Sequence, residues 1–309
     1  MTADPLRADD VRKVYERRGD PPVEALKGVS LVVRAGERIA LLGRNGAGKT
    51  TFLKIASTLL APSSGSIRVF DHDVDLDPSE VRRLIAVVPQ EGKPFFHLTP
   101  KEQVYTYLLS RGFPRDEAKR RTEEALDQME LREFSDRLSI TLSGGQRQRT
   151  MVATVIATEA PLLFLDEPTI GLDPFARRRV WESLRSLTRK GSTILLTTHY
   201  LDEAEALSDR LYIIERGRVL VDGTASTLKA QVGGSVRVSI EGAEGFRESF
   251  ASFGTGLVDG GVLHVITTPE RVPEALGVAA RHHLSTTIGP VTLEEAFLRV
   301  VGRSIDEES

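Results

Sequence analysis

The chain of 309 residues is long enough for one large domain and a second, small one. Its 41 Lys and Arg residues against 44 Asp and Glu give a formal net charge of −3, which excludes the strong basic field of nucleic-acid-binding proteins, and its lack of cysteine excludes disulfides, thiolate metal sites and cysteine nucleophiles. The sequence has neither a signal-peptide core nor an apolar run of the roughly 18 residues that a membrane span needs, so we expect a soluble chain. A cytoplasmic location is compatible with the lack of cysteine, and we expect no nucleic-acid partner.

Up to about residue 230 the sequence alternates short apolar runs with longer amphipathic ones. The apolar runs are typical of strands buried on both faces of a largely parallel sheet, and they lie at 38–43, 84–90, 161–168, 192–200 and 210–223. The amphipathic runs predict helices at 49–60, 79–84, 101–110, 115–130, 144–159, 174–189 and 201–208. This alternation predicts an α/β fold, and the helix-rich stretch at about 91–159 predicts a helical subdomain inserted into it.

Paired glycines in the stretch QVGGS, at 231–235, mark a domain boundary. We expect one domain over residues 1–230 and a small accessory or regulatory domain over 231–309. Beyond the boundary the order is βαββαβ, with strand-like runs at 236–240, 256–258, 262–268 and 284–288 and helical runs at 245–253 and 269–283. The Asp-Gly-Gly at 259–261 is a hairpin signal. The pattern predicts a ferredoxin-like α+β domain, closed by a helix at 292–302 and without a chemical motif of its own.

The stretch GRNGAGKT, from Gly43 to Thr50, has the spacing of a phosphate-binding loop, between a strand-like run and a helix-like one. Backbone N–H groups at a helix start are unpaired and carry partial positive charge, so the amides around Asn45 to Thr50 can surround phosphate oxygens. Lys49 can reach the β- and γ-phosphates, and the Thr50 hydroxyl can bind Mg²⁺. The alternative is a glycine-rich turn with an accidental Gly-Lys-Thr.

Two carboxylates end the apolar run LLFLDEP at 162–168. A buried strand places Asp166 and Glu167 at the rim of an α/β sheet, where ligands bind in this class. We expect Asp166 to hold Mg²⁺ through water and Glu167 to polarise a water that attacks the γ-phosphate. The alternative is a solvated strand end.

The stretch LSGGQRQR, at 142–149, precedes a helix-like run. Ser143, Gly144 and Gly145 can build a second anion-binding helix start. The alternative is an ordinary serine N-cap.

A phosphate loop, an Asp-Glu strand end and LSGGQ in this combination resemble the ATP-binding-cassette (ABC) ATPases, and the resemblance covers residues from about 6 to 225. It implies the P-loop NTPase fold of the ABC nucleotide-binding domain, with ATP and Mg²⁺ as cofactors. The segments 196–224 and 290–302 also look like cassette subunits of daunorubicin and multidrug exporters, the ABC-2 type branch.

Further positions take their expected roles from this resemblance. Tyr15 matches an aromatic ring that stacks on adenine, with a half-buried strand tyrosine as the alternative. Gln90 matches a glutamine that senses Mg²⁺ and the γ-phosphate, and His199 matches a histidine that hydrogen-bonds the γ-phosphate; a loop amide and a core histidine are the alternatives. Asp173 matches a loop that crosses the dimer interface, where a helix N-cap is also compatible. Ile170 departs from the family, which usually has a small residue there.

These assignments define three sets of predicted site residues. The catalytic set is Glu167, His199 and Gln90. The Mg²⁺ set is Thr50, Gln90 and Asp166. The nucleotide-binding set is Tyr15, Gly43, Asn45, Gly46, Ala47, Gly48, Lys49, Thr50, Thr51, Ser143, Gly144, Gly145, Gln146 and Asp173.

The resemblance implies an ATP-hydrolysing transporter subunit. Ser143 and Gly145 of one copy would complete the site on the phosphate loop of a second copy, so that two ATP molecules hold a head-to-tail homodimer together. With no membrane span of its own, the chain would dock on a separate permease at the inner face of the membrane. Export of drugs or other hydrophobic compounds is the expected direction, with import as the rival.

A different class of function, a cassette ATPase acting in translation or DNA repair without a membrane partner, is the alternative. Translation factors of this family hold two cassettes in one chain, and repair ATPases insert long coiled coils. Neither a second phosphate loop nor room for a coiled-coil arm between Lys49 and Ser143 is present in the sequence.

Overall fold

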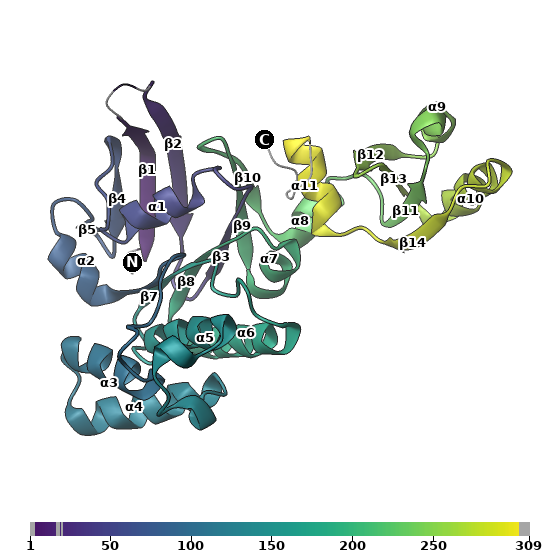
Figure 1. Cartoon of the computed structure of the whole chain (residues 1–309). Helices are drawn as coiled ribbons and strands as arrows, with labels where there is room; N and C mark the ends of the chain where they lie inside the picture. Colours follow the sequence, from purple (N-terminus) through teal and green to yellow (C-terminus); the bar gives the residue numbers. More distant parts are fainter. Residues whose placement is uncertain (1–3, 17–18, 20, 303–309) are drawn as a thin grey trace.

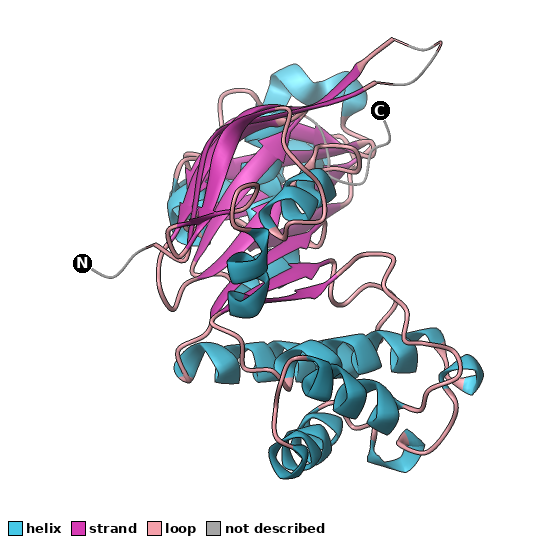
Figure 2. Cartoon of the chain, turned by 90° about the vertical axis from the view of Figure 1, so that its left-hand side faces the viewer, coloured by secondary structure: helices cyan, strands magenta, loops and turns pink. Residues whose placement is uncertain are grey.

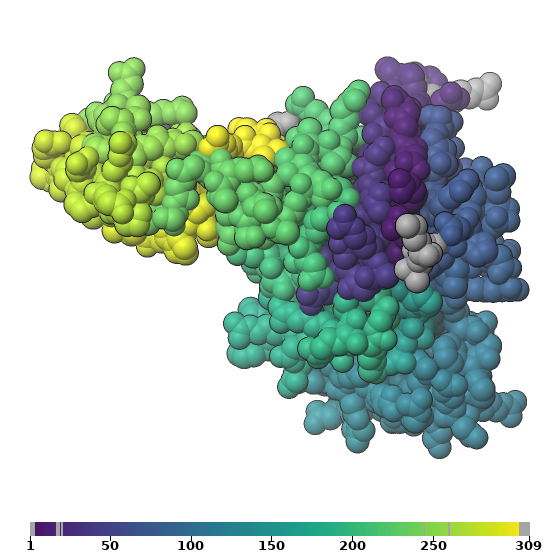
Figure 3. Space-filling model, turned by 180° about the vertical axis from the view of Figure 1, so that it is seen from behind, coloured from purple at the N-terminus to yellow at the C-terminus, as the bar shows by residue number. Residues whose placement is uncertain are grey.

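The computed structural model describes residues 4–16, 19 and 21–302, and its central body is made of two sheets with helices packed on them (Figure 1). A helical lobe lies at one end of this body, and the C-terminal segment extends to the side (Figure 3). The predicted α/β fold is confirmed.

The main sheet has six strands in the order β10-β9-β3-β8-β7-β6. All neighbours are parallel except β9 and β10, which form an antiparallel hairpin turning at Arg216 and Gly217. The apolar run expected at 210–223 is therefore two strands. The bounds are β3 Arg38–Leu42, β6 Ile85–Val88, β7 Leu162–Asp166, β8 Thr193–Thr198, β9 Arg210–Glu215 and β10 Arg218–Gly223.

The inner strands of this sheet are buried on both faces, which explains why β3, β7 and β8 are apolar without alternation, whereas the edge strand β10 is not buried. Along β3, Ile39 and Leu41 enter one hydrophobic core, whereas Ala40 and Leu42 enter another on the opposite face. The second core is covered by helices of the body and of the lobe, including α5 Gly144–Ile156, α6 Pro174–Arg189 and α7 Leu201–Leu207.

A second sheet, antiparallel and of four strands, covers the core that contains Ile39 and Leu41, together with α1 Lys49–Ala56 and α2 Pro78–Leu84. Its order is β2-β1-β4-β5, with bounds β1 Leu6–Tyr15, β2 Val23–Val33, β4 Ser64–Val69 and β5 His72–Asp73. The sequence patterns described above do not predict this sheet. It matters for function because Tyr15 lies at the end of β1.

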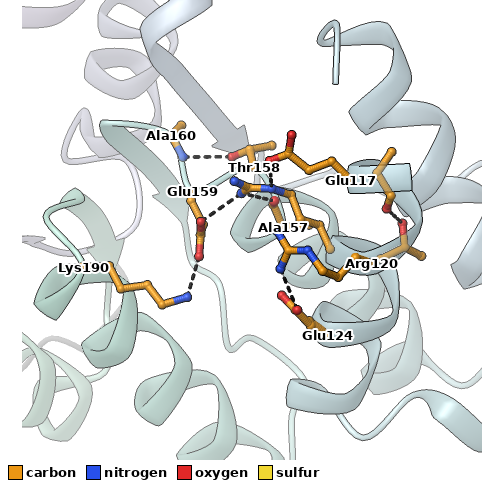
Figure 4. Close-up of polar contacts among 11 residues, drawn as sticks. Glu117, Arg120, Glu124, Ala157, Thr158, Glu159, Ala160 and Lys190 are labelled. Atoms are coloured by element: carbon orange, nitrogen blue, oxygen red, sulfur yellow. Dashed lines mark hydrogen bonds and ion pairs between the residues drawn. The ribbon is translucent and has the colours of Figure 1, made fainter. Parts of the chain in front are cut away.

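The helical lobe contains α3 Pro100–Ser110, α4 Arg115–Gln128 and α5, in agreement with the helical subdomain predicted at about 91–159 (Figure 2). A polar cluster joins the lobe to the body (Figure 4). Arg121 of α4 donates to Glu159 Oε2 over 2.9 Å and to the Ala157 carbonyl over 3.2 Å, while Lys190, directly after α6, donates to Glu159 Oε1 over 2.5 Å. The cluster therefore fixes the end of α5 between α4 and α6.

The C-terminal segment forms a third sheet of four antiparallel strands in the order β12-β13-β11-β14. The βαββαβ order and the hairpin at Gly260–Gly261 are as predicted. The bounds are β11 Val236–Glu241, α9 Arg247–Phe250, β12 Thr255–Asp259, β13 Val262–Thr267, α10 Val272–Arg281 and β14 Thr286–Pro290. The last strand lies two residues further along than expected.

The final helix, α11 Leu293–Val301, contacts the third sheet at β12 and also packs on the body. Leu293, Ala296 and Phe297 join the main hydrophobic core, where α11 packs on α7 and on α8 Ala225–Ala230. The division into residues 1–230 and 231–309 stays a prediction, and α11 packs across it.

Candidate functional site

An open pocket of about 390 Å³ lies where the phosphate-loop stretch meets the ends of the strands. Four parts of the chain contribute to it: the antiparallel sheet, the loop before α1, the segment after β6 and the segment after β7. Its lining consists of Tyr15, Val23, Ala25, Arg44, Asn45, Gly46, Ala47, Gly48, Lys49, Thr50, Thr51, Gln90 and Glu167. Ten of the predicted site residues therefore meet in one place.

The glycines of the loop have different structural tasks. Gly46 and Gly48 have φ of 77° and 109°, a left-handed backbone that side chains strain. Gly43 has an ordinary φ, but a Cβ there would lie 2.3 Å from the Ile214 carbonyl oxygen. A glycine is needed at this position because the loop packs closely against β9. Gly48 is also the N-cap of α1 and offers no side-chain cap, which leaves the first amides of the helix free for a ligand.

Lys49 is the first residue of α1, and its side chain turns back over the loop. Nζ donates to the carbonyl oxygens of Gly43 over 2.6 Å and Arg44 over 3.1 Å, with the residue only 5% exposed. Burial lowers the pKa of Lys49, and the neighbouring carboxylates offset part of this effect. Neutral carbonyl groups thus hold the ammonium at the pocket. A phosphate bound there would add negative charge and stabilise the charged form of Lys49 further.

Three oxygen-bearing side chains of the predicted Mg²⁺ set converge beside Lys49. Thr50 Oγ1 lies 3.1 Å from Gln90 Oε1 and 3.2 Å from Asp166 Oδ1. Thr197, at the end of the neighbouring strand β8, donates to the same Asp166 oxygen over 2.5 Å. Burial raises the pKa of Asp166, and the hydroxyls of Thr197 and Thr50 offset part of the rise. Hydroxyl, amide and carboxylate oxygens are the ligand types that Mg²⁺ prefers, so this donor set fits the ion.

Glu167 lies next to this group in a strained backbone conformation, with φ of 50°. Its amide N–H is held by Thr197, whose carbonyl oxygen lies at 3.2 Å and whose Oγ1 lies at 3.1 Å. Burial alone would raise the pKa of Glu167, but His199, Lys49 and Gln90 outweigh it and the pKa lies below its ordinary value. The carboxylate is therefore ionised at neutral pH and can accept a proton.

His199 follows β8 and faces Glu167, although it does not line the pocket itself. Its Nδ1 lies 3.2 Å from Glu167 Oε2. The ring packs against Tyr200, with 4.2 Å between centroids. The two predicted catalytic residues at the ends of β7 and β8 are thus in contact, as parallel neighbouring strands require.

The remaining predicted site residues lie away from the pocket. Ser143 caps α5: its Oγ accepts from the Gln146 amide over 3.2 Å, and Gln146 Oε1 accepts from the Ser143 amide over 2.9 Å. Asp173 caps α6 by accepting from the amides of Phe175 and Ala176 over 2.9 and 3.0 Å. Both N-caps are therefore present, and the interface roles of these residues and of Gly144 and Gly145 stay predictions.

Comparison with known proteins defines the family. The ABC transporter family model matches residues 26–170. The daunorubicin/doxorubicin resistance ATP-binding protein DrrA of Streptomyces peucetius is 37% identical over 100% of this chain and 97% of its own. The chain belongs to the ATP-binding subunits of ABC transporters.

Other relatives of this ABC subunit agree with the assignment. The Nod factor export ATP-binding protein I of Burkholderia lata is 35% identical over 98% of this chain and 100% of its own. Among solved structures, an ATP-binding subunit of an ABC transporter matches with a TM-score of 0.66 and 32% identity over 74% of this chain and 93% of its own. A dimeric cassette in a post-hydrolysis state, bound to ADP and Pi, matches with a TM-score of 0.66 and 29% identity over 71% of this chain and 98% of its own.

The ABC subunit is therefore an ATPase that binds ATP and ADP. No helix within the described part of the chain is both long and apolar enough to cross a membrane. The predicted resemblance to the ABC ATPases is confirmed, and nothing favours the alternative class of translation or repair ATPases.

Three pocket features escape the sequence analysis. Val23 and Ala25 reach the pocket from β2, a strand that was not predicted. Arg44 lines it with a nearly buried side chain whose Nε has no hydrogen-bond partner among the described residues. Thr197 orients Asp166 and Glu167 through hydrogen bonds. The sequence feature that could have predicted this role is a hydroxyl side chain at the end of the strand-like run that follows the Asp-Glu run.

Proposed function

We propose that this ABC subunit hydrolyses Mg-ATP at the pocket beside Lys49 and couples hydrolysis to the opening and closing of a head-to-tail homodimer, which drives a separate membrane permease. The observation that carries the proposal is the meeting of the uncapped α1 start, Lys49, the Thr50 oxygen cluster and Glu167 in one pocket. Each of these groups has a distinct part in phosphoryl transfer.

Binding relies on the loop before α1. The free amides at the start of α1 point partial positive charge at the phosphates, and Lys49 adds a full charge on the same side. Tyr15 also lines the pocket, 36% exposed, with its Oη 3.4 Å from Thr51 Oγ1. Its exposed ring can stack on adenine.

Thr50, Gln90 and Asp166 would hold Mg²⁺, whose chemistry at this place is to neutralise phosphate charge. Thr197 keeps the Asp166 carboxylate turned toward Thr50. Gln90 belongs to the segment that leads into the helical lobe, so the same side chain joins the phosphate site to the lobe.

Glu167 acts as the general base that takes a proton from the attacking water. Its lowered pKa keeps it ionised, and its strained backbone, fixed by Thr197, holds the carboxylate at the pocket. His199, in contact with Glu167, hydrogen-bonds the γ-phosphate and orients the base.

The second nucleotide-facing set requires a second copy of the chain. Ser143, Gly144, Gly145 and Gln146 begin α5 and do not line the pocket of their own copy. In a head-to-tail dimer the start of α5 of one copy caps the γ-phosphate bound by the other, and Asp173 crosses the interface. The related cassette bound to ADP and Pi is dimeric, which supports the homodimer of this proposal.

The relatives support export as the direction of transport. Their names describe daunorubicin and doxorubicin resistance and Nod factor export, and two of them match this chain over nearly its full length. We infer that the permease partner is an exporter of drugs or other hydrophobic compounds, of the ABC-2 type. The chain then works in the cytoplasm at the inner face of the membrane, where ATP is available.

Replacement of the base tests the catalytic assignment. Glu167→Gln keeps the size and acceptor oxygen of the side chain but cannot take a proton, so hydrolysis should fall by roughly 10²- to 10⁴-fold. The matched control is Glu182→Gln on the exposed face of α6, which should hydrolyse ATP at the wild-type rate. Near-normal turnover in Glu167→Gln would mean that another group is the base.

The neighbouring reading frame tests the partner. We expect it to encode a protein with about six apolar spans, each of roughly 20 residues. A neighbour that encodes a nuclease or a ribosomal factor would favour the soluble class of function instead.

A further inference from the structure

A buried carboxyl group outside the pocket has no part in the scheme above. Glu203 of α7 is 0% exposed. A carboxyl group removed from water is costly unless other groups bond to it, so its position needs a physical reason.

The contacts of Glu203 come from two other elements. Its Oε1 accepts a hydrogen bond from Thr169 Oγ1 over 2.8 Å and a second from Trp181 Nε1 over 3.0 Å. Its Oε2 is buried without a hydrogen-bond partner among the described residues. Thr169 is itself fully buried, and Trp181 is partly buried on α6, which packs beside α7 (Figure 1).

Each of the three joined segments carries a predicted site residue. Thr169 is two residues after Glu167, Trp181 lies on the helix that Asp173 begins, and Glu203 is four residues after His199. The segment between Glu167 and Asp173 has little freedom, because Ile170 N donates to the Glu167 carbonyl and Leu172 N to the Thr169 carbonyl. The placement of Thr169 therefore determines where the residues on either side of it lie.

We propose that Glu203 is a positioning residue for ATP hydrolysis: through Thr169 and Trp181 it ties the 167–173 segment to the segment that carries His199, so that the base, the γ-phosphate contact and the interface loop move as one unit. The inference rests on the proposed function, because it gives Glu203 its effect through Glu167 and His199. Glu203 touches neither nucleotide nor water in this scheme.

The electrostatics of the group agree with this role. Burial raises the pKa of Glu203, and the neighbouring polar groups of Thr198, Thr169 and Trp181 offset only part of the rise. An amide at this position keeps the acceptor oxygen that both donors use. Glu203→Gln is therefore the conservative variant, whereas Glu203→Ala removes the acceptor and Thr169→Val removes one donor at nearly constant volume.

The kinetic test measures kcat and KM for ATP in these three variants. We expect Glu203→Ala and Thr169→Val to lower kcat by about 10- to 100-fold, the cost of misplacing a reacting group by roughly 1 Å, with KM little changed. Glu203→Gln should restore kcat toward wild type. Glu205→Gln, the same exchange on the exposed side of α7 where Glu205 pairs with Lys229, is the matched control and should behave as wild type.

A spectroscopic test separates positioning from simple support of the fold. Trp181 is the single tryptophan of the chain, so the intrinsic fluorescence reports on the group that bonds to Glu203. A non-hydrolysable ATP analogue should shift the emission of wild type, since the 167–173 segment moves with the γ-phosphate. In Thr169→Val the same analogue should bind with unchanged affinity and leave the emission where it was.

The outcomes distinguish the two proposals. The positioning role is wrong if Thr169→Val keeps wild-type kcat, even with lower thermal stability, or if it keeps the full analogue-induced shift of the Trp181 emission. Thr169→Val alone also decides between the two results if Glu203→Ala does not fold. If wild type itself neither hydrolyses ATP nor binds the analogue, the proposed function fails instead.

Discussion

Glu167 unites a strained backbone, a lowered pKa and contact with His199 in one residue. A left-handed conformation costs a glutamate of the order of 1–3 kcal/mol, and here two hydrogen bonds from its amide to Thr197 maintain it. Strain held in this way would suit the proposed role of Glu167 as general base, since the carboxylate would need no movement to reach an attacking water.

Lys49 makes a second residue-scale prediction. Lys49→Ala should leave the fold intact and raise the Kd for ATP by roughly tenfold to a hundredfold, because charged hydrogen bonds contribute about 1.5–3 kcal/mol each. Lys54→Ala on the exposed side of the same helix is the control and should bind ATP normally. If a calorimetric titration finds wild-type affinity for ATP in Lys49→Ala, the assignment of the phosphate loop to the ATP-binding site is wrong.

At the residue scale the sequence was informative wherever spacing determines chemistry. GRNGAGKT and LLFLDEP brought Lys49, Thr50, Asp166 and Glu167 into one predicted site, and the structure places them together. The reason for Gly43 was not predictable: it is required by the Ile214 carbonyl of a strand about 170 residues away in sequence, and a local pattern contains no sign of that approach. The same holds for Arg44, whose burial depends on tertiary packing.

At the scale of elements, burial on both faces made β3, β7 and β8 recognisable, whereas β1 and β2 were missed. In β1 the alternation is broken by register irregularities between Ala8 and Val11 and again between Lys13 and Val14, so no clean period of two remains there. In β2 the alternation is clean only over residues 29–33. The C-terminal order βαββαβ was predictable because each run is short and the Gly260–Gly261 turn punctuates it. What α11 packs against could not be read from its own amphipathic pattern.

The start of α11 gives a prediction about pH. Glu295 is fully buried; its Oε1 accepts from Arg237 Nη1 over 2.5 Å and its Oε2 from the Thr292 amide over 2.6 Å. Burial alone would raise the pKa of Glu295, but Arg237 and Thr292 outweigh it and the pKa lies below its ordinary value. A depressed pKa in the folded state adds stability above the unfolded pKa of about 4.3, which is lost as the pH falls through the folded value.

Urea unfolding of wild type and Glu295→Gln should therefore differ by a constant free energy above about pH 5 and converge as the pH falls through the lowered folded-state pKa of Glu295. Wild type is expected to be the more stable at neutral pH, because the variant removes the buried, closely paired carboxylate and leaves Arg237 only the more distant Glu294 at 4.0 Å. A difference that persists unchanged at the acidic end would show that the pair does not titrate as described.

At the scale of the whole molecule, α11 makes the C-terminal segment part of the ATPase body. Phe297 is fully buried in the main core, so Phe297→Ala should lower the free energy of unfolding by about 3–5 kcal/mol. Phe175→Ala, at a residue 81% exposed, is the control and should cost little. Equal losses in both variants, measured by chemical denaturation, would mean that α11 is not docked in solution.

ATP is proposed to close two copies of this chain head-to-tail, with Ser143 of one copy on the nucleotide of the other. Light scattering of purified Glu167→Gln with and without ATP tests it most directly, because a variant that binds but does not hydrolyse should accumulate the closed form. We predict a dimer with ATP, a monomer without it, and a monomer under both conditions when Ser143→Arg is added to place a bulky side chain against the γ-phosphate. A Glu167→Gln protein that stays monomeric while ATP is bound, or a Ser143→Arg double variant that still dimerises, would contradict the account.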